Sequence, residues 1–188
     1  HREFNKEGKV VASKVYSKEG KVVGEGIFEE TGKKEGPWKM YYDSGKLKES
    51  GSYKNGKKSG KWIFYYETGE KEQVGNYKGG KESGEWVYYT KDGKVLKEEN
   101  YYKGKLDGLY TEYDREGTIL FKGEYVEGYK TGEWYYHVND HIEKGKYTDD
   151  EKDGKWKYYY PEDKLKYEGK FILGSENGNN KRYYPDGK

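Results

Sequence analysis

The sequence predicts an all-β fold, an elongated repeat array of consecutive antiparallel β-hairpins in a single twisted sheet. Three observations predict it. One pattern of tryptophan, tyrosine and glycine recurs about every 24 residues, the segments between turns are β-branched and aromatic, and helical apolar spacing is absent. We therefore expect residues 1–23 to hold one or more degenerate hairpin units, and residues 24–188 to form about seven tandem repeats in one continuous domain.

The repeat is visible when "GSYKNGKKSGKWIFYYETGEKEQV" (51–74) is aligned with "GNYKGGKESGEWVYYTKDGKVLKEE" (75–99). Its most regular markers are an aromatic residue, nearly always tryptophan, and a glycine two positions earlier. The aromatic position holds Trp38, Trp62, Trp86, Tyr110, Trp134 and Trp156, and the glycine position holds Gly36, Gly60, Gly84, Gly108, Gly132, Gly154 and Gly178. We expect each unit to contact only its neighbours along the array.

Each unit is interpreted as a hairpin. The strand after the tryptophan ends in turn residues such as "DSG", "ETG" and "KDG", and a second strand runs to the next "G-x-Y". In "GKWIFYYETG" (60–69), both glycines are interpreted as hairpin turns. Strand alternation places Trp62 and Phe64 on one face and Ile63 and Tyr65 on the other.

The composition excludes several classes of function. Only 31% of residues are hydrophobic, but 24 Tyr and 5 Trp can each bury roughly 150–250 Å², which is enough for a core. There is no cysteine, and 37 basic and 35 acidic residues are interspersed, so we expect no thiolate metal site and no nucleic-acid partner. No segment is apolar enough for an integral membrane span. The chain begins at His1, so we expect a trimmed N-terminus, and we favour a secreted, periplasmic or cell-surface location over a cytoplasmic one.

Two aromatic columns are the candidate functional features. Tyrosines three residues after the tryptophan position are expected to form a structural ladder that packs between units: Tyr41, Tyr65, Tyr89, Tyr113, Tyr159 and Tyr183. The tryptophans are expected either to pack under the adjoining strand or to line an aromatic binding face: Trp38, Trp62, Trp86, Trp134 and Trp156.

Motifs for chemistry are weak. "GSYKNGKKS" (51–59) is close to a phosphate-binding loop but precedes a strand, and "TDDEKDG" (148–154) has partial calcium-loop spacing without the final glutamate. His137 and His141 flank a hairpin turn, and we interpret His137 as a replacement of a ladder tyrosine. Because no single cluster stands out from the repeats, we expect no catalytic residue, no cofactor and no metal site, and therefore not an enzyme.

The spacing "G-x-Y-x-x-G-x-x-x-G-x-W-x-x-Y-Y-x-x-G-K" resembles the bacterial variant of the MORN repeat over residues 24–188. The resemblance implies an elongated sheet of hairpins with a binding or scaffolding role. Such bacterial proteins are often labelled antitoxin-like, and eukaryotic relatives are associated with scaffolding and membrane apposition. Tyr110 and Asn180 in tryptophan positions, and the shortened unit around His137, depart from the pattern.

The resulting functional hypothesis is a non-enzymatic repeat scaffold for protein–protein interaction, with a place at the cell surface as one option. One alternative is a carbohydrate- or choline-binding surface module, because repeats of that class also use "G-x-W-Y-Y" before a glycine turn. A second alternative is an antitoxin-like partner of a toxin. The chain stops inside a turn at "RYYPDGK", so self-association through an open C-terminal edge is also expected.

Overall fold

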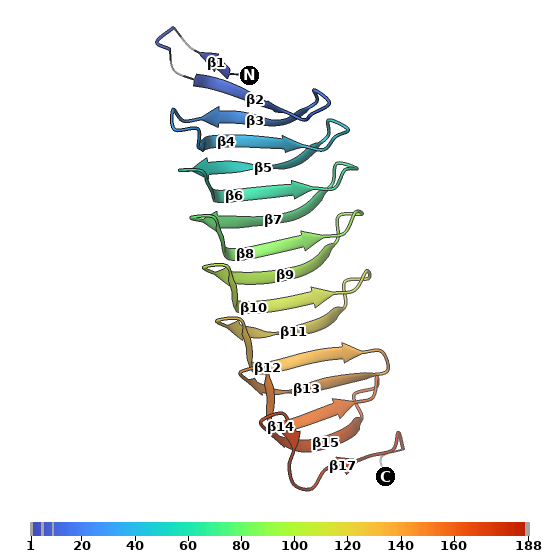
Figure 1. The fold of residues 1–188 in the computed structure, drawn as a ribbon. Coiled ribbons are helices and arrows are strands. Elements are labelled where there is room, and N and C mark those ends of the chain that lie inside the picture. Colours follow the sequence, from blue (N-terminus) through green and yellow to red (C-terminus); the bar gives the residue numbers. More distant parts are fainter. Residues whose placement is uncertain (1, 5, 9, 187–188) are drawn as a thin grey trace. The chain divides into compact units, whose positions relative to one another are not determined.

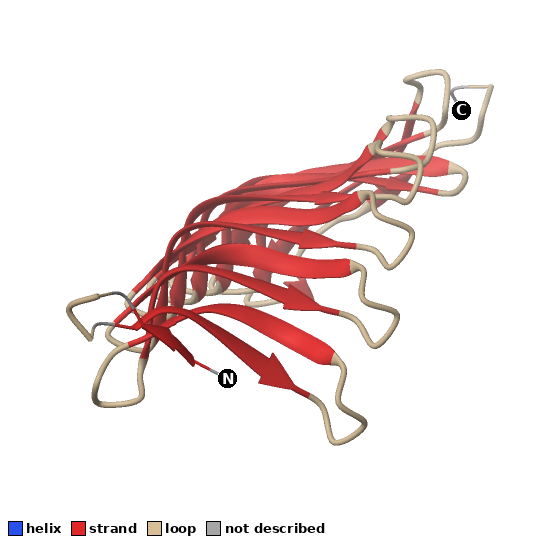
Figure 2. Ribbon diagram, turned by 90° about the horizontal axis from the view of Figure 1, so that it is seen from above, coloured by secondary structure: helices blue, strands red, loops and turns tan. Residues whose placement is uncertain are grey.

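The computed structural model describes residues 2–4, 6–8 and 10–186, and all of its regular elements are β-strands (Figure 1; Figure 2). The predicted fold of consecutive antiparallel hairpins is therefore confirmed. The chain divides into two compact units, unit 1 (residues 1–95) and unit 2 (residues 96–188). The boundary predicted between residues 23 and 24 lies inside a strand and stays a prediction.

Unit 1 is an antiparallel sheet in which each strand pairs with the next along the chain. Its strands are β1 (Arg2–Phe4), β2 (Val10–Tyr16), β3 (Val22–Phe28), β4 (Lys34–Tyr41), β5 (Leu47–Lys54), β6 (Lys57–Tyr65), β7 (Lys71–Lys78) and β8 (Lys81–Tyr89).

Unit 2 follows the same order, except that its last two strands are short and both pair with the same neighbour. Its strands are β9 (Val95–Tyr102, of which Val95 belongs to unit 1), β10 (Lys105–Tyr113), β11 (Ile119–Val126), β12 (Tyr129–Val138), β13 (His141–Thr148), β14 (Glu151–Tyr159), β15 (Leu165–Ile172), β16 (Ser175–Glu176) and β17 (Lys181–Arg182).

Two kinds of turn alternate between the strands. Between β5 and β6, Asn55 and Gly56 form a two-residue turn with φ angles of 53° and 76°, the left-handed values of a type I′ hairpin. Gly56 N–H also donates a 3.0 Å hydrogen bond to the carbonyl of Lys34 in the preceding hairpin. The other turn is longer and is closed by Gly69 N–H, which donates to the Tyr66 carbonyl at 2.9 Å. We name the end of each sheet with two-residue turns the short-turn edge.

The glycine two residues before the tryptophan position lies inside a strand in every unit except the last, where Gly178 lies between β16 and β17. Gly60 has a φ of 69° within β6, a left-handed conformation that costs glycine little. The interpretation of both glycines in "GKWIFYYETG" as hairpin turns is thus right for Gly69 and wrong for Gly60. The same left-handed φ recurs at Gly36, Gly84, Gly108, Gly132, Gly154 and Gly178.

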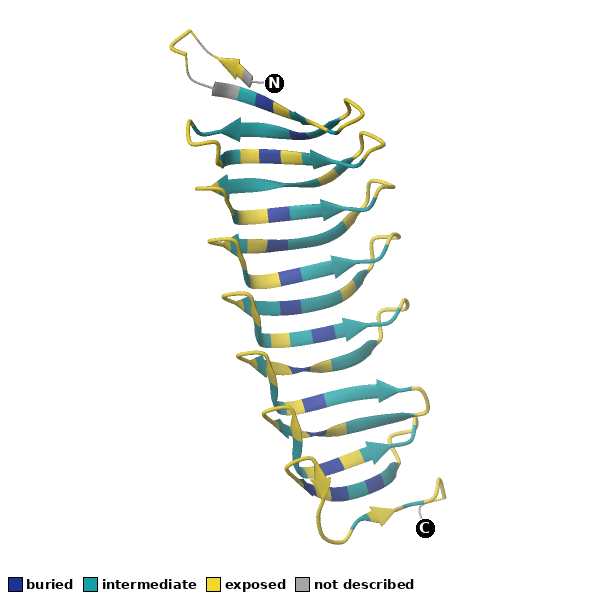
Figure 3. Ribbon diagram, in the orientation of Figure 1, coloured by how far each residue is buried: buried dark blue, intermediate teal, exposed yellow. Residues whose placement is uncertain are grey.

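Each sheet has two distinct faces, as strand alternation predicts. We name the side that carries the tryptophans the tryptophan face, and the side that carries the tyrosines three residues later the tyrosine face. Buried residues lie in the middle of the strands, and the turns are exposed (Figure 3). In a sheet without a covering layer, each buried position must therefore be shielded by side chains of neighbouring strands.

Candidate binding surface

The tryptophans form the core of both units. Their exposed fractions are 1% for Trp38, 0% for Trp62, 2% for Trp86, 3% for Trp134 and 0% for Trp156. Of the two expected arrangements, the structure therefore has the packed one. An open groove of indole rings is not present at these residues, because neighbouring side chains cover them.

A glycine in the preceding strand makes room for each indole ring. A Cβ built on Gly51 would lie 2.3 Å from Cδ2 of Trp62, closer than any real side chain approaches a ring. Trp62 Nε1–H donates a 3.1 Å hydrogen bond to the carbonyl of Ser52, the next residue. The first glycine of the "G-x-Y" motif is therefore the packing partner of tryptophan. Equivalent pairs are Gly26 with Trp38, Gly75 with Trp86, Gly123 with Trp134, and Gly145 with Trp156.

A tyrosine nine residues before four of the tryptophans completes the core, and Phe28 takes this role beside Trp38. The rings of Tyr53 and Trp62 meet edge to face with centroids 5.1 Å apart, and Tyr53 also contacts Trp38 at 6.0 Å. Such edge-to-face pairs are favourable because the ring edge is positive and the ring face negative. The same geometry recurs for Tyr77 with Trp86, Tyr125 with Trp134, and Tyr147 with Trp156, all at 5.1–5.2 Å.

Lysines of the chain itself occupy the outer side of several indole rings. Lys58 Nζ lies 4.1 Å from the Trp62 ring centroid and 2.7 Å from Glu49 Oε2. Lys152 takes the same place over Trp156 at 4.0 Å. A ligand ammonium would bind at the same cation–π position, which lysines of the chain already occupy over these rings.

The tyrosine ladder is half-buried on the opposite face. Tyr41, Tyr65, Tyr89, Tyr113, Tyr159 and Tyr183 all have intermediate exposure. Tyr113 O–H donates to Glu98 Oε2 at 2.9 Å, and Tyr41 O–H donates likewise to Glu25. Burial, followed by this hydrogen bond to Glu25, raises the pKa of Tyr41 to about 12. The ladder therefore lies on the solvent-facing side of each sheet, and its structural role stays a prediction.

One rung of unit 2 departs from the core pattern. Tyr110 stands in the tryptophan position, and Glu99, opposite it in register, stands where other rungs have glycine. Glu99 is 4% exposed; it accepts a hydrogen bond from Tyr101 O–H at 2.8 Å and pairs with Lys97 at 2.7 Å. Burial and a hydrogen bond to Glu112 raise the pKa of Tyr110. Tyrosine is smaller than tryptophan and glutamate is larger than glycine, so the two replacements compensate for each other in volume.

On the tyrosine face of unit 2, the same region carries exposed apolar side chains. Tyr102 is 58% exposed, Leu109 61%, Val126 50% and Tyr129 53%. Val126 and Tyr129 are directly opposite each other at the short-turn edge of β11 and β12. We name these four residues the apolar patch. Large apolar side chains gathered on one face of adjacent strands are typical of interaction sites.

Sequence reasoning did not identify this patch, although the repeat alignment contains its signal. At the positions of Val126 and Tyr129, the unit "YKNGKKSGK" (53–61) has Lys54 and Lys57, and at the position of Leu109 it has Lys61. Comparison of equivalent surface positions shows that unit 2 has apolar side chains where the unit at residues 53–61 has lysines.

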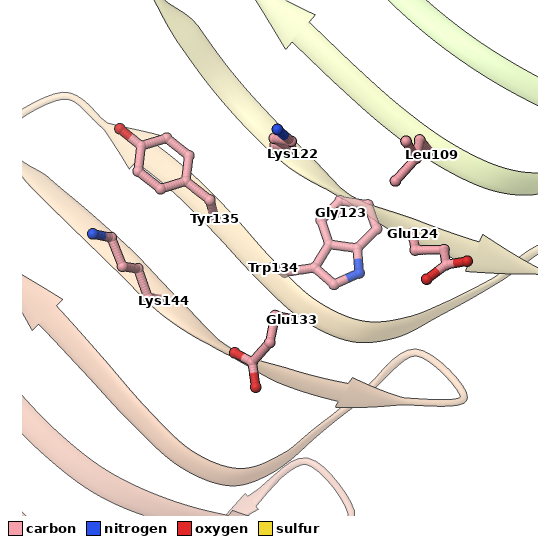
Figure 4. A pocket seen from close by; sticks show the side chains of 8 residues that line it. All are labelled: Leu109, Lys122, Gly123, Glu124, Glu133, Trp134, Tyr135 and Lys144. Carbon is pink, nitrogen blue, oxygen red and sulfur yellow. The ribbon is translucent and has the colours of Figure 1, made fainter.

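A shallow depression of about 390 Å³ adjoins the apolar patch (Figure 4). Leu109 lies at one side of it, Lys122 and Lys144 at the other, and the backbone of Gly123 with Trp134 beneath forms its floor. The surface thus combines apolar and charged side chains around a hollow over the glycine.

The weaker motifs of the sequence lead to no assembled site. Residues 51–59 form two strands and their turn, without a following helix. His141 contacts Asp140 at 2.8 Å and Glu143 at 3.1 Å, while His137 lies in β12 with its Nδ1 buried. Within the described residues, no group of three or more His, Asp or Glu side chains is arranged to hold a metal ion. Nor does that part of the chain contain a helix that could cross a membrane.

The C-terminal edge is partly covered by short strands. β15 pairs with β16 through Phe171 and Ile172, and with β17 through Tyr167 and Glu168. Where a tryptophan is expected, Asn180 is present, and the ring of Tyr167 is buried against Tyr158 at 4.6 Å instead. Little regular strand is left to accept another chain, and self-association at this edge stays a prediction.

Comparison with known proteins supports the repeat assignment. A family model described as the MORN repeat variant matches residues 34–55, 58–78, 82–103, 106–127 and 152–172, which together cover more than half of the chain. The unit around Trp134 and His137 lies outside these matches, although it forms β12 and β13 like the others. No curated protein matches the sequence.

Proposed function

The chain belongs to the MORN repeat variant family, and on this premise we propose that it is a scaffold that binds another protein through the apolar patch of unit 2. The observation that carries the proposal is the exposure of four large apolar side chains at positions where unit 1 has mainly lysine. Aromatic and aliphatic side chains bordered by charged residues such as Lys122 and Glu124 match the usual anatomy of a protein interface, in which apolar residues are surrounded by a polar rim.

The proposal is non-enzymatic. The residues that distinguish this region from other repeats are apolar surface side chains, not a nucleophile with a base or a pair of carboxylates. The carbohydrate- or choline-binding alternative would be favoured by exposed indole faces, but the tryptophans are buried and lysines cover rings such as Trp62. The antitoxin alternative stays a prediction, and a toxin gene beside this one would favour it.

The test is a triple variant that gives unit 2 the residues of unit 1: Leu109→Lys, Val126→Lys and Tyr129→Lys. Because unit 1 folds with lysine at these positions, the variant is expected to keep its fold, which circular dichroism and tryptophan fluorescence will check. Proteins of the source cells that the wild type captures should be lost from the triple variant. A matched control, Lys54→Ala with Lys57→Ala in unit 1, should retain them. Equal capture by the wild type and the triple variant would exclude the patch as the binding site.

A further inference from the structure

Five lysines gather on the tyrosine face of unit 2, next to the apolar patch. They are Lys144, Lys146, Lys155, Lys157 and Lys170, on strands β13, β14 and β15, and all are exposed. Lys144 stands directly opposite Lys157, and Lys155 directly opposite Lys170. Like charges in direct cross-strand pairs destabilise a sheet. We name these five residues the lysine patch; unlike the opposed lysines of unit 1, Lys54 with Lys57 and Lys78 with Lys81, its pairs lie within the strands and not beside a turn.

Acids face the lysine patch in register, Glu133 and Asp153 opposite Lys146 and Glu168 opposite Lys157, but they form no ion pair with it. On the tryptophan face, Lys58 pairs with Glu49 at 2.7 Å and Lys152 with Glu143 at 3.1 Å. In the described part of the chain, none of the five patch lysines lies within 4.0 Å of a carboxylate, and the opposing acid Glu168 pairs instead with Lys181 at 3.6 Å. The patch lysines are therefore available to a partner, whereas Lys58 and Lys152 on the tryptophan face are neutralised within the chain.

The patch has a shape that suits an anionic group. A depression of about 230 Å³ lies over Gly169, and four lysines and one carboxylate line it: Lys155, Lys157, Lys170, Lys181 and Glu168. Lys144 extends the patch to the depression beside Leu109, where its Nζ lies 5.2 Å from the ring centroid of Tyr159. The lysine patch and the apolar patch are thus joined along one face.

We propose that the lysine patch binds an acidic segment of a protein partner, adjacent to the part of that partner held by the apolar patch; this inference rests on the proposed function. Neighbouring strands are about 4.8 Å apart and alternate residues of a strand about 6.8 Å apart, so the backbone positions of the patch lysines are spaced like alternate residues of an extended peptide, within reach of its side chains. Complementary charge of this kind fixes orientation and raises the association rate.

The surroundings favour a protein over a nucleic acid or an anionic membrane. Unit 2 as a whole has 17 basic and 20 acidic residues, which opposes a polyphosphate backbone. At the short-turn edge, Glu127 and Asp149 lie on turns and Glu151 begins β14, near the exposed Val126 and Ile172, so anionic headgroups would meet negative charge there.

The test measures fluorescence anisotropy of a labelled oligoglutamate peptide titrated with the full chain, with an oligoglutamine peptide as the neutral control. Two variants reverse both members of an opposed pair: Lys144→Glu with Lys157→Glu, and Lys155→Glu with Lys170→Glu. Because each keeps two like charges facing each other, stability should stay close to that of the wild type. The control with the same change of net charge is Lys39→Glu with Lys61→Glu, on the tyrosine face of unit 1.

We expect oligoglutamate to bind and oligoglutamine not to bind. Each patch variant should raise Kd by about tenfold or more, the unit 1 control should stay within about twofold, and affinity should fall between about 50 and about 300 mM salt. The inference is overturned if oligoglutamate shows no saturable binding, if the unit 1 control weakens binding equally, or if a single-stranded oligonucleotide or phosphatidylserine vesicles bind more tightly through the same lysines. The apolar triple variant, which adds three lysines beside the patch, should bind oligoglutamate at least as tightly as the wild type, so failure of the proposed function and failure of this inference are distinguishable.

Discussion

Units 1 and 2 are built from the same repeat, yet their surfaces have opposite character. Residues 1–95 carry 20 basic and 15 acidic side chains, while residues 96–188 carry 17 and 20. The short-turn edge of unit 1 has Lys54, Lys57 and Lys78 where unit 2 has Tyr102, Val126 and Tyr129. Meanwhile the core geometry is the same, with tyrosine and tryptophan rings 5.1 Å apart in both units. The tryptophan face is thus fixed by packing, whereas the tyrosine face is free to vary because little packs on it.

The largest expected effect tests the shared core. Trp62→Ala in unit 1 should lower the free energy of unfolding by about 3–5 kcal/mol, because it removes a fully buried ring whose glycine partner cannot fill the space. Urea unfolding followed by circular dichroism will measure it. Tyr89→Ala, on the half-buried ladder, is the comparison and should cost clearly less. Equal losses would mean that both faces contribute alike to the core.

The next effect tests the pair of Tyr110 and Glu99, which stands in unit 2 where unit 1 has tryptophan and glycine. Tyr110→Trp alone should cost about 1–3 kcal/mol, since the indole would meet the side chain of Glu99. Glu99→Gly alone should cost about 1–3 kcal/mol, because Lys97 and the Tyr101 hydroxyl lose their carboxylate. The double variant has tryptophan facing glycine, as in unit 1. Its free energy of unfolding should fall by less than the sum of the two single losses. If a double-mutant cycle gives losses that add within about 0.5 kcal/mol, the exchange is not compensating.

A smaller effect compares the lysines that cover the core in each unit. Lys58→Met should cost about 1–2 kcal/mol, because it removes a cation–π contact at 4.1 Å and leaves Glu49 without its partner. Lys130→Met in unit 2 should cost about 0.5 kcal/mol or less: burial lowers the pKa of Lys130, and its ring contact with Trp134 is longer, at 4.8 Å. Chemical denaturation at neutral pH will rank the two variants, and the reverse order would contradict this account.

The smallest effect concerns alkaline stability. Burial, and after it the charge of Glu82, raises the pKa of Tyr77 to about 12. The folded state therefore keeps the Tyr77 proton at pH values where the unfolded chain has lost it. The stability that Tyr77 contributes is complete below about pH 10 and is lost as the pH rises toward about 12. In Tyr77→Phe the loss of stability between about pH 8 and about pH 11 should be smaller than in the wild type. Tyr102→Phe, at an exposed position of unit 2, is the control and should behave as the wild type.

The repeat pattern was enough to predict the hairpins, but not which aromatic column is buried. Both columns recur with the same regularity, and Trp62 and Tyr65 differ only in the side of the strand on which they lie. The neighbouring strand decides which ring is buried, because Gly51 leaves space for the ring of Trp62. That space depends on the pairing of two strands, so the pattern within one strand does not show it. In the same way, the pattern predicts a turn at Gly60, whereas the structure places this glycine inside β6 with a left-handed φ.

The sequence by itself determined the all-β repeat architecture, because strand alternation, turn residues and a constant period are local properties of the chain. The sequence also shows that Tyr110 replaces a tryptophan and that Glu99 replaces a glycine. That the two replacements compensate for each other depends on two residues eleven positions apart becoming neighbours. Only the tertiary structure decided that the tryptophans are core and that Lys144 faces Lys157. Burial and cross-strand register are set by the pairing of strands, and that pairing places on one face residues that the sequence keeps apart.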